Sequence, residues 1–159
     1  MRKIRYFDDE FTADEWVRRE VCKNAGACRD KSRVVRKEEL LAWCEEKGIA
    51  YKKSATKEML LDLLIENGCS YEEVAVKFEI GVTSREYKNS FGLSQEEVKA
   101  LEENGVLSVI ALKPFKHYGF YRSRMLVASI YDLYQYCRMT DEDMKMILEE
   151  YPSGKQVEL

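Results

Sequence analysis

Hydrophobic residues recur along most of the chain at the spacing of amphipathic helices. Apolar positions at i, i+3, i+4 and i+7 occur in residues 71–78, 130–137 and 144–151, and Met59, Leu60, Leu63 and Leu64 form a further stripe. Because such a stripe lies on one side of a helix, each set predicts a helix packed on a core. The pattern predicts helices over residues 12–25, 36–47, 56–67, 71–80, 84–91, 94–104, 128–138 and 141–151.

Capping signals mark the ends of several of these helices. A hydroxyl residue followed three positions later by Glu forms a capping box, which satisfies early helix N–H groups. The pairs are Thr12 with Glu15, Ser70 with Glu73, Thr83 with Glu86, and Ser94 with Glu97. Glycine is favoured just after a helix, where the backbone turns left-handed. The candidates are Gly26, Gly48, Gly68, Gly81, Gly92 and Gly105.

One region departs from the helical pattern. Residues 106–112 are apolar and largely β-branched, residues 113–119 contain Pro114 and Gly119, and residues 120–127 alternate along the chain. This succession predicts a β-hairpin with Arg122 and Arg124 on one side of a strand. The expected fold class is therefore mainly α with one β-hairpin.

Residues 33–68 contain two amphipathic helices joined by an extended, basic loop. The segments RKEELLAWCEEKGI and TKEMLLDLL resemble the HeH/LEM and SAP group of helix–extended-loop–helix modules. SAP-type modules bind DNA through the start of the first helix and the loop, whereas LEM-type modules bind proteins, so the resemblance leaves both partners open. The DNA-binding candidates that it implies are Arg33, Arg36, Lys37, Lys52, Lys53 and Lys57.

Residues 82–127 contain a short helix, a Gly-Leu-Ser turn, a second helix and the predicted hairpin. This order resembles the winged helix-turn-helix of MerR-like and excisionase-like DNA binders, especially in SREYKNSFGLSQEEVKALEENGVL. By that resemblance Gln95 opens the recognition helix and can read an adenine, and Arg85 and Lys88 come from the helix before it. The remaining candidates are in the wing: Lys113, Lys116, Arg122 and Arg124.

The two modules give a predicted domain organisation. We expect an N-terminal helix plus the helix–extended-loop–helix module over residues 1–68, the winged helix-turn-helix with C-terminal helices over 69–151, and a tail over 152–159. Proteins with such paired modules resemble small accessory proteins of phages and mobile elements. The resemblance implies a role in packaging, integration or assembly.

Charge refines the functional prediction. The net charge is −3, yet residues 29–57 carry 9 basic and 5 acidic side chains, and residues 113–138 carry 5 and 1. Two basic islands in an acidic chain favour local phosphate binding. We therefore expect non-catalytic nucleic-acid binding, most simply to duplex DNA, although the cations do not distinguish DNA from RNA. The alternative is a scaffolding protein that docks a basic partner on acidic helices, through Glu72, Glu73, Glu79, Glu96, Glu102 and Glu103.

The sequence contains little that indicates an enzyme, a metal site or a membrane protein. No phosphate-binding glycine motif is present, and His117 is the single histidine, so an enzyme is not expected. The spacing of Cys22, Cys28 and Cys44, taken with His117, is not that of known structural zinc sites, so no metal or cofactor is expected. Five scattered cysteines without a C-x-x-C pair, no targeting signal and no long apolar run predict a cytoplasmic protein with no membrane partner.

Overall fold

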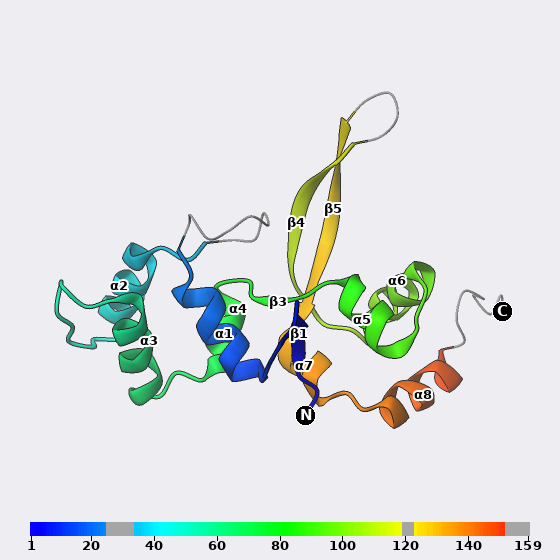
Figure 1. The fold of residues 1–159 in the computed structure, drawn as a ribbon, viewed down its shortest axis with the longest axis horizontal. Helices are drawn as coiled ribbons and strands as arrows, with labels where there is room; N and C mark the ends of the chain where they lie inside the picture. Colours follow the sequence, from blue (N-terminus) through cyan, green and yellow to red (C-terminus); the bar gives the residue numbers. More distant parts are fainter. Residues whose placement is uncertain (25–33, 119–122, 152–159) are drawn as a thin grey trace. The chain divides into compact units, whose positions relative to one another are not determined.

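The structure is a computed structural model that describes residues 1–24, 34–118 and 123–151, with the backbone alone at 115–118 and 123–126. The described residues are mainly helical, with two small antiparallel sheets (Figure 1). The chain divides into an N-terminal unit, Lys3–Ile80, and a C-terminal unit made of Met1–Arg2 and Gly81–Leu159. The sequence-based boundary at 68/69 differs from this division. Within the described residues, the helices are too short or too polar to cross a bilayer.

The N-terminal unit begins with a small hairpin that the sequence analysis did not predict. Strand β1 (Ile4–Tyr6) pairs with β2 (Asp9–Phe11), and the helices α1 (Ala13–Cys22), α2 (Lys37–Glu46), α3 (Lys57–Glu66) and α4 (Tyr71–Lys77) follow. Their apolar faces form one core, whose fully buried residues include Val17, Val21, Leu40, Leu60, Leu61, Leu64 and Val74.

The buried side of α3 differs from the predicted stripe. Met59 is 54% exposed, whereas Leu61 is fully buried. The physical reason is that α3 contacts both α1 and α2, so two adjoining sides of the helix are covered. A single stripe at i, i+3 and i+4 describes a helix that is covered from one side only.

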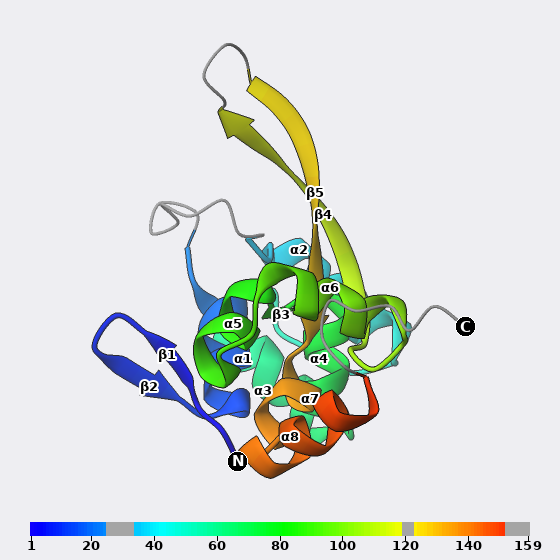
Figure 2. The same cartoon turned by 90° about the vertical axis from the view of Figure 1, so that its right-hand side faces the viewer.

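The C-terminal unit is built around a three-stranded antiparallel sheet. Its elements are β3 (Gly81–Val82), α5 (Ser84–Phe91), α6 (Gln95–Glu103), β4 (Val109–Tyr118), β5 (Ser123–Asp132), α7 (Leu133–Arg138) and α8 (Asp141–Glu150). Strand β5 is central, in the order β3-β5-β4. The short strand β3 pairs only with the end of β5, at Tyr131 and Asp132. The rest of β4 and β5 forms a two-stranded ribbon, which extends beyond the helices of this unit as a twisted hairpin (Figure 2).

This hairpin corrects two predictions. Residues 113–118 belong to β4 rather than to a turn, and residues 128–132 belong to β5 rather than to a helix. The apolar spacing from Ile130 onwards fits a helix, but Ile130 and the neighbouring Tyr131 are both buried in the sheet. The helix starts only after Asp132, whose carboxylate accepts the Gln135 backbone N–H at 2.9 Å.

The predicted capping boxes at Thr12, Ser70, Thr83 and Ser94 are confirmed. Positive φ angles are also confirmed at Gly48, Gly68, Gly92 and Gly105. Gly81 was wrongly expected at a helix end; it lies in β3, where an added Cβ would come within 2.2 Å of the Tyr131 carbonyl oxygen. Gly26 lies outside the described residues.

The chain's first two residues complete the C-terminal unit. The backbone N–H of Arg2 donates to the Cys137 carbonyl at 2.7 Å. Its guanidinium lies 4.4 Å from the centre of the Phe91 ring and 2.8 Å from the Asp141 carboxylate. Arg2 therefore ties α5, α7 and α8 together.

Candidate nucleic-acid interface

The predicted cations of the N-terminal unit gather at the start of α2 and in the loop before α3. Arg36 is the N-cap residue of α2, and its backbone N–H donates to the Glu39 carboxylate at 2.8 Å. The Lys37 ammonium donates to the Lys53 carbonyl at 2.8 Å and so holds the loop against α2. Lys52 and Lys53 are exposed and form no ion pair within the described part of the chain. We refer to Arg36, Lys37, Lys52 and Lys53 as the loop cluster.

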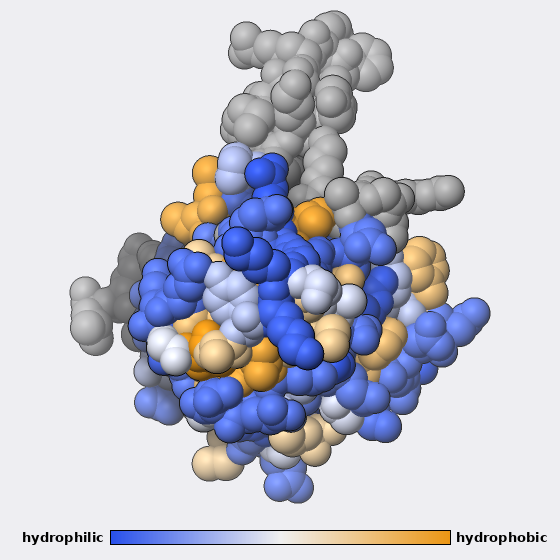
Figure 3. Space-filling view, turned by 90° about the vertical axis from the view of Figure 1, so that its left-hand side faces the viewer, coloured by the Kyte–Doolittle hydropathy of each residue, from blue (hydrophilic) through white to orange (hydrophobic). Residues whose placement is uncertain are grey.

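The loop cluster includes the N-cap residue of α2 and the residue after it. The surface over α2 and α3 is mostly hydrophilic (Figure 3). Cations beside a helix N-terminus favour an anion there, because the unpaired N–H groups and the helix dipole add to their charge. Glu38 and Glu39 in the first turn of α2 offset part of this potential. The loop cluster is therefore suited to a weak phosphate contact.

Lys57 serves the fold as well. Its ammonium donates to the carbonyl of Lys23, at the end of α1, at 2.8 Å, and its side chain is half-buried. This bond joins the start of α3 to the end of α1. The Lys57 ammonium is therefore less available to bind a phosphate than a fully exposed cation. Arg33, the other candidate of this module, lies outside the described residues.

Helices α5 and α6 hold their predicted contact residues in one small network. The Gln95 side-chain oxygen accepts from the Lys88 ammonium at 2.9 Å and from the Ser84 hydroxyl at 3.2 Å. Bidentate reading of adenine uses both the oxygen and the nitrogen of the amide, so Gln95 would have to give up both bonds. Arg85 is exposed and has no ion pair among the residues described.

The hairpin carries the remaining candidates. Lys113 and Lys116 lie in β4, and Arg124 lies in β5, where its register partner is His117. Lys113 is half-buried and interacts within the protein. Arg122 lies outside the described residues. No acidic residue occurs between Glu103 and Asp132 in the sequence, so both strands are free of carboxylates up to Tyr131.

The acidic residues of the alternative prediction are divided between the two units. Glu72, Glu73 and Glu79 belong to the N-terminal unit, and Glu96, Glu102 and Glu103 belong to the C-terminal unit. Glu73 caps α4, Glu102 accepts the Tyr131 hydroxyl at 2.7 Å, and Glu72 also interacts within the protein. The six do not form one surface within either unit.

Among the described cysteines, Cys44, Cys69 and Cys137 are buried and Cys22 is half-buried. Burial raises the pKa of Cys137 to about 11 and also raises the pKa of Cys22 and Cys44. A thiol nucleophile needs the opposite shift, so these three side chains remain protonated at neutral pH. Cys28 lies outside the described residues. Within the described ranges, no three His, Cys, Asp or Glu side chains converge as a metal site would require.

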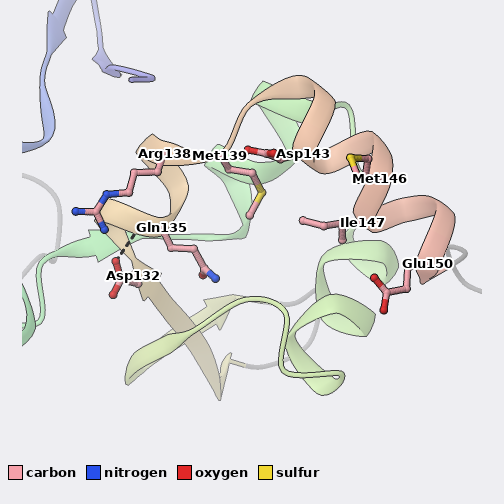
Figure 4. A pocket seen from close by; sticks show the side chains of 8 residues that line it. All are labelled: Asp132, Gln135, Arg138, Met139, Asp143, Met146, Ile147 and Glu150. Carbon is pink, nitrogen blue, oxygen red and sulfur yellow. Dashed lines mark hydrogen bonds between the residues drawn. The ribbon is translucent and has the colours of Figure 1, made fainter.

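Sequence reasoning overlooked a groove between α7 and α8. Its lining residues are Asp132, Gln135, Arg138, Met139, Asp143, Met146, Ile147 and Glu150 (Figure 4). The one sequence signal for it is Met146, an apolar residue on the polar side of α8.

Comparison of the chain with protein-family models, with curated proteins and with solved structures finds no match in any of the three.

Proposed function

We propose that the protein binds duplex DNA, without catalysis and with little dependence on base sequence. The observation that carries the proposal is the hairpin β4–β5. The hairpin has two strands of ten residues. Together the strands contain Lys113, Lys116 and Arg124, and they contain no carboxylate before Asp132. Because every acid near a phosphate weakens binding, such a ribbon in a chain of net charge −3 is a suitable polyanion contact.

The shape of the hairpin supports contact with a groove of DNA. A two-stranded ribbon fits the major groove, and basic wings with apolar side chains insert into the minor groove. Leu112 and Val127 on the hairpin are 64% and 66% exposed. These two side chains are not buried in the core of the unit, so they are available to contact sugars or base edges.

The order of elements supports the winged helix-turn-helix interpretation. Two helices joined through Gly92 lie between β3 and β4, and the sheet order is β3-β5-β4. In that interpretation α6 is the recognition helix. Its exposed Glu96 and Glu103 repel phosphate, and Gln95 is bonded to Lys88. We therefore assign most of the affinity to the hairpin and little to reading by α6.

The test is the fluorescence anisotropy of a labelled DNA duplex, titrated with protein at several salt concentrations. Contacts with about 4–6 phosphates give a slope of log K against log salt near −4 to −5. Replacement of Lys113, Lys116 and Arg124 by alanine should reduce the slope by about 2 to 3. Replacement of Lys52 and Lys53 should reduce it by up to about 2 if the loop cluster contacts DNA.

A matched control is the triple variant Lys3→Ala, Lys99→Ala and Lys145→Ala. It removes the same charge from exposed positions outside the hairpin and the loop cluster. If it lowers the slope as much as the hairpin variant does, the hairpin assignment is wrong. Absence of binding at low salt would refute the proposed function itself.

A further inference from the structure

The groove between α7 and α8 has an apolar floor and a charged rim. Met139 is buried and Ile147 half-buried, whereas Met146 is 68% exposed. Asp132, Asp143 and Glu150 contribute carboxylates, and Arg138 contributes one cation. The groove has a volume of about 600 Å³. Figure 4 shows these side chains on α7 and α8, with Asp132 at the end of β5 and Met139 between the two helices.

Helix α8 is only partly covered by the described residues of its own unit. Its apolar stripe is Met144, Ile147, Leu148 and Tyr151, of which Met144 alone is buried. A helix that belonged only to the core would bury most of such a stripe. Methionine is unbranched and polarizable, and it is common on surfaces that adapt to a partner helix.

Hydrogen bonds fix three of the polar side chains that line the groove, Gln135, Asp132 and Asp143. The Gln135 amide donates to the Val106 carbonyl at 2.8 Å and accepts the Ser108 backbone N–H at 2.8 Å. Asp132 caps α7, and Asp143 caps α8 through the backbone N–H of Thr140. A groove fixed in this way loses little conformational entropy when a partner binds.

Charge selects the kind of partner. Residues 139–151 contain five acidic side chains and a single lysine. We propose that this groove binds a basic amphipathic helix of a partner protein, with its apolar residues on Met146 and Ile147 and its cations facing Glu150 and Asp143. Helix α8 has ten residues and is thus about 15 Å long. This length matches apolar anchors at i, i+3 or i+4, and i+7 of the partner.

The experiment uses the full chain and a fluorescein-labelled peptide of about 14 residues, in which leucines form one helical side and lysines the other. The expected result is saturable binding, and weaker binding when glutamate replaces every lysine in the peptide. Methyl NMR of the methionines should show shifts for Met146 and Met139, and none for the exposed Met59 of the other unit. Equal shifts at Met59, or equal binding of the glutamate peptide, would overturn the proposal.

Matched variants test the two parts of the groove separately. Met146→Ser should weaken peptide binding about tenfold, as expected for loss of one buried apolar side chain, whereas Met59→Ser should not. Glu150→Lys should weaken binding about threefold more than Glu142→Lys, an equal charge change on the same helix outside the groove. Equal effects within either pair would contradict the assigned groove.

Two further measurements test whether the occupant is a second copy of the chain and whether the groove acts independently of DNA binding. Sedimentation velocity of the protein alone should show a monomer. If the protein instead self-associates and Met146→Ser abolishes the self-association, the occupant is a second copy of this chain and the proposal is wrong. DNA binding of Met146→Ser should equal that of the unmodified protein. The groove and the DNA-binding hairpin can therefore fail or succeed independently.

Discussion

The hydroxyl group of Tyr87 lies in the core of the C-terminal unit with no hydrogen-bond partner among the described residues. The Tyr87 ring packs against the rings of Phe91, Tyr131 and Tyr136, with distances of 5.9, 5.6 and 5.1 Å between ring centroids. Burial raises the pKa of Tyr87, so the phenol remains neutral. A buried unpaired hydroxyl costs free energy that the same ring without oxygen would not.

We expect Tyr87→Phe to leave the free energy of unfolding unchanged or to increase it by up to about 1 kcal/mol. Tyr136→Phe is the control, since its hydroxyl is hydrogen-bonded to Ser90. Its loss should destabilise the unit by about 1 kcal/mol. Urea unfolding of the two variants provides the comparison. A larger loss for Tyr87→Phe than for Tyr136→Phe would mean that the Tyr87 hydroxyl is satisfied in solution.

At the scale of elements, the N-terminal caps of α1 and α8 depend on ionised carboxylates. Backbone hydrogen bonds from Thr12 and Thr140 lower the pKa of Glu15 and Asp143, respectively. A carboxylate with a lower pKa in the folded state stabilises the fold above its unfolded pKa, and that contribution is lost as the pH falls through the folded pKa. The ordinary pKa values here are 4.5 and 3.8.

The double variant Glu15→Gln and Asp143→Asn should therefore have a flatter dependence of stability on pH below about 4.5. Near neutral pH it should be less stable than the unmodified protein, because each amide is a weaker acceptor at a helix start. Melting temperatures measured from pH 3 to pH 7, roughly the range over which carboxylates titrate, test this expectation. If the loss of stability at acidic pH is the same in the double variant, other carboxylates dominate the pH dependence.

Capping chemistry and apolar spacing were sufficient to predict most helices, because both are local properties. The Thr12, Ser70, Thr83 and Ser94 boxes act within four residues of chain. The length of the hairpin could not be predicted in the same way. Residues 128–131 become a strand because they pair with β4, and β3, nearly fifty residues earlier, pairs with Tyr131 and Asp132; no local pattern encodes these contacts.

The candidate site was predictable only as a set of residue types. The sequence indicated the loop cluster and the hairpin cations, and the loop cluster does come together through the bond from Lys37 to Lys53. It could not indicate that Lys57 binds the Lys23 carbonyl or that Gln95 binds Lys88. These engagements depend on how separate helices pack. The groove between α7 and α8 was missed for the same reason.

At the scale of the whole molecule, Arg2 belongs to the C-terminal unit although Lys3 belongs to the N-terminal unit. Arg2→Ala should therefore destabilise the C-terminal unit by about 1–2 kcal/mol, through loss of its cation–π contact and its bond to Asp141. Hydrogen exchange should become faster in α7 and α8 and remain unchanged in α1 to α4. Lys3→Ala, one residue away and exposed, is the control and should change neither unit.

The position of Arg2 also has a consequence for the order of events on the ribosome. Synthesis runs from the N-terminus, so Arg2 is made well before Phe91, Cys137 and Asp141. The N-terminal unit has all its residues once Ile80 has emerged, and it can fold while translation continues. The C-terminal unit can be completed only after residues 81–141 have been made, when Arg2 packs against Phe91 and Asp141. A bulky fusion at Met1 should therefore hinder the last stage of folding rather than the first.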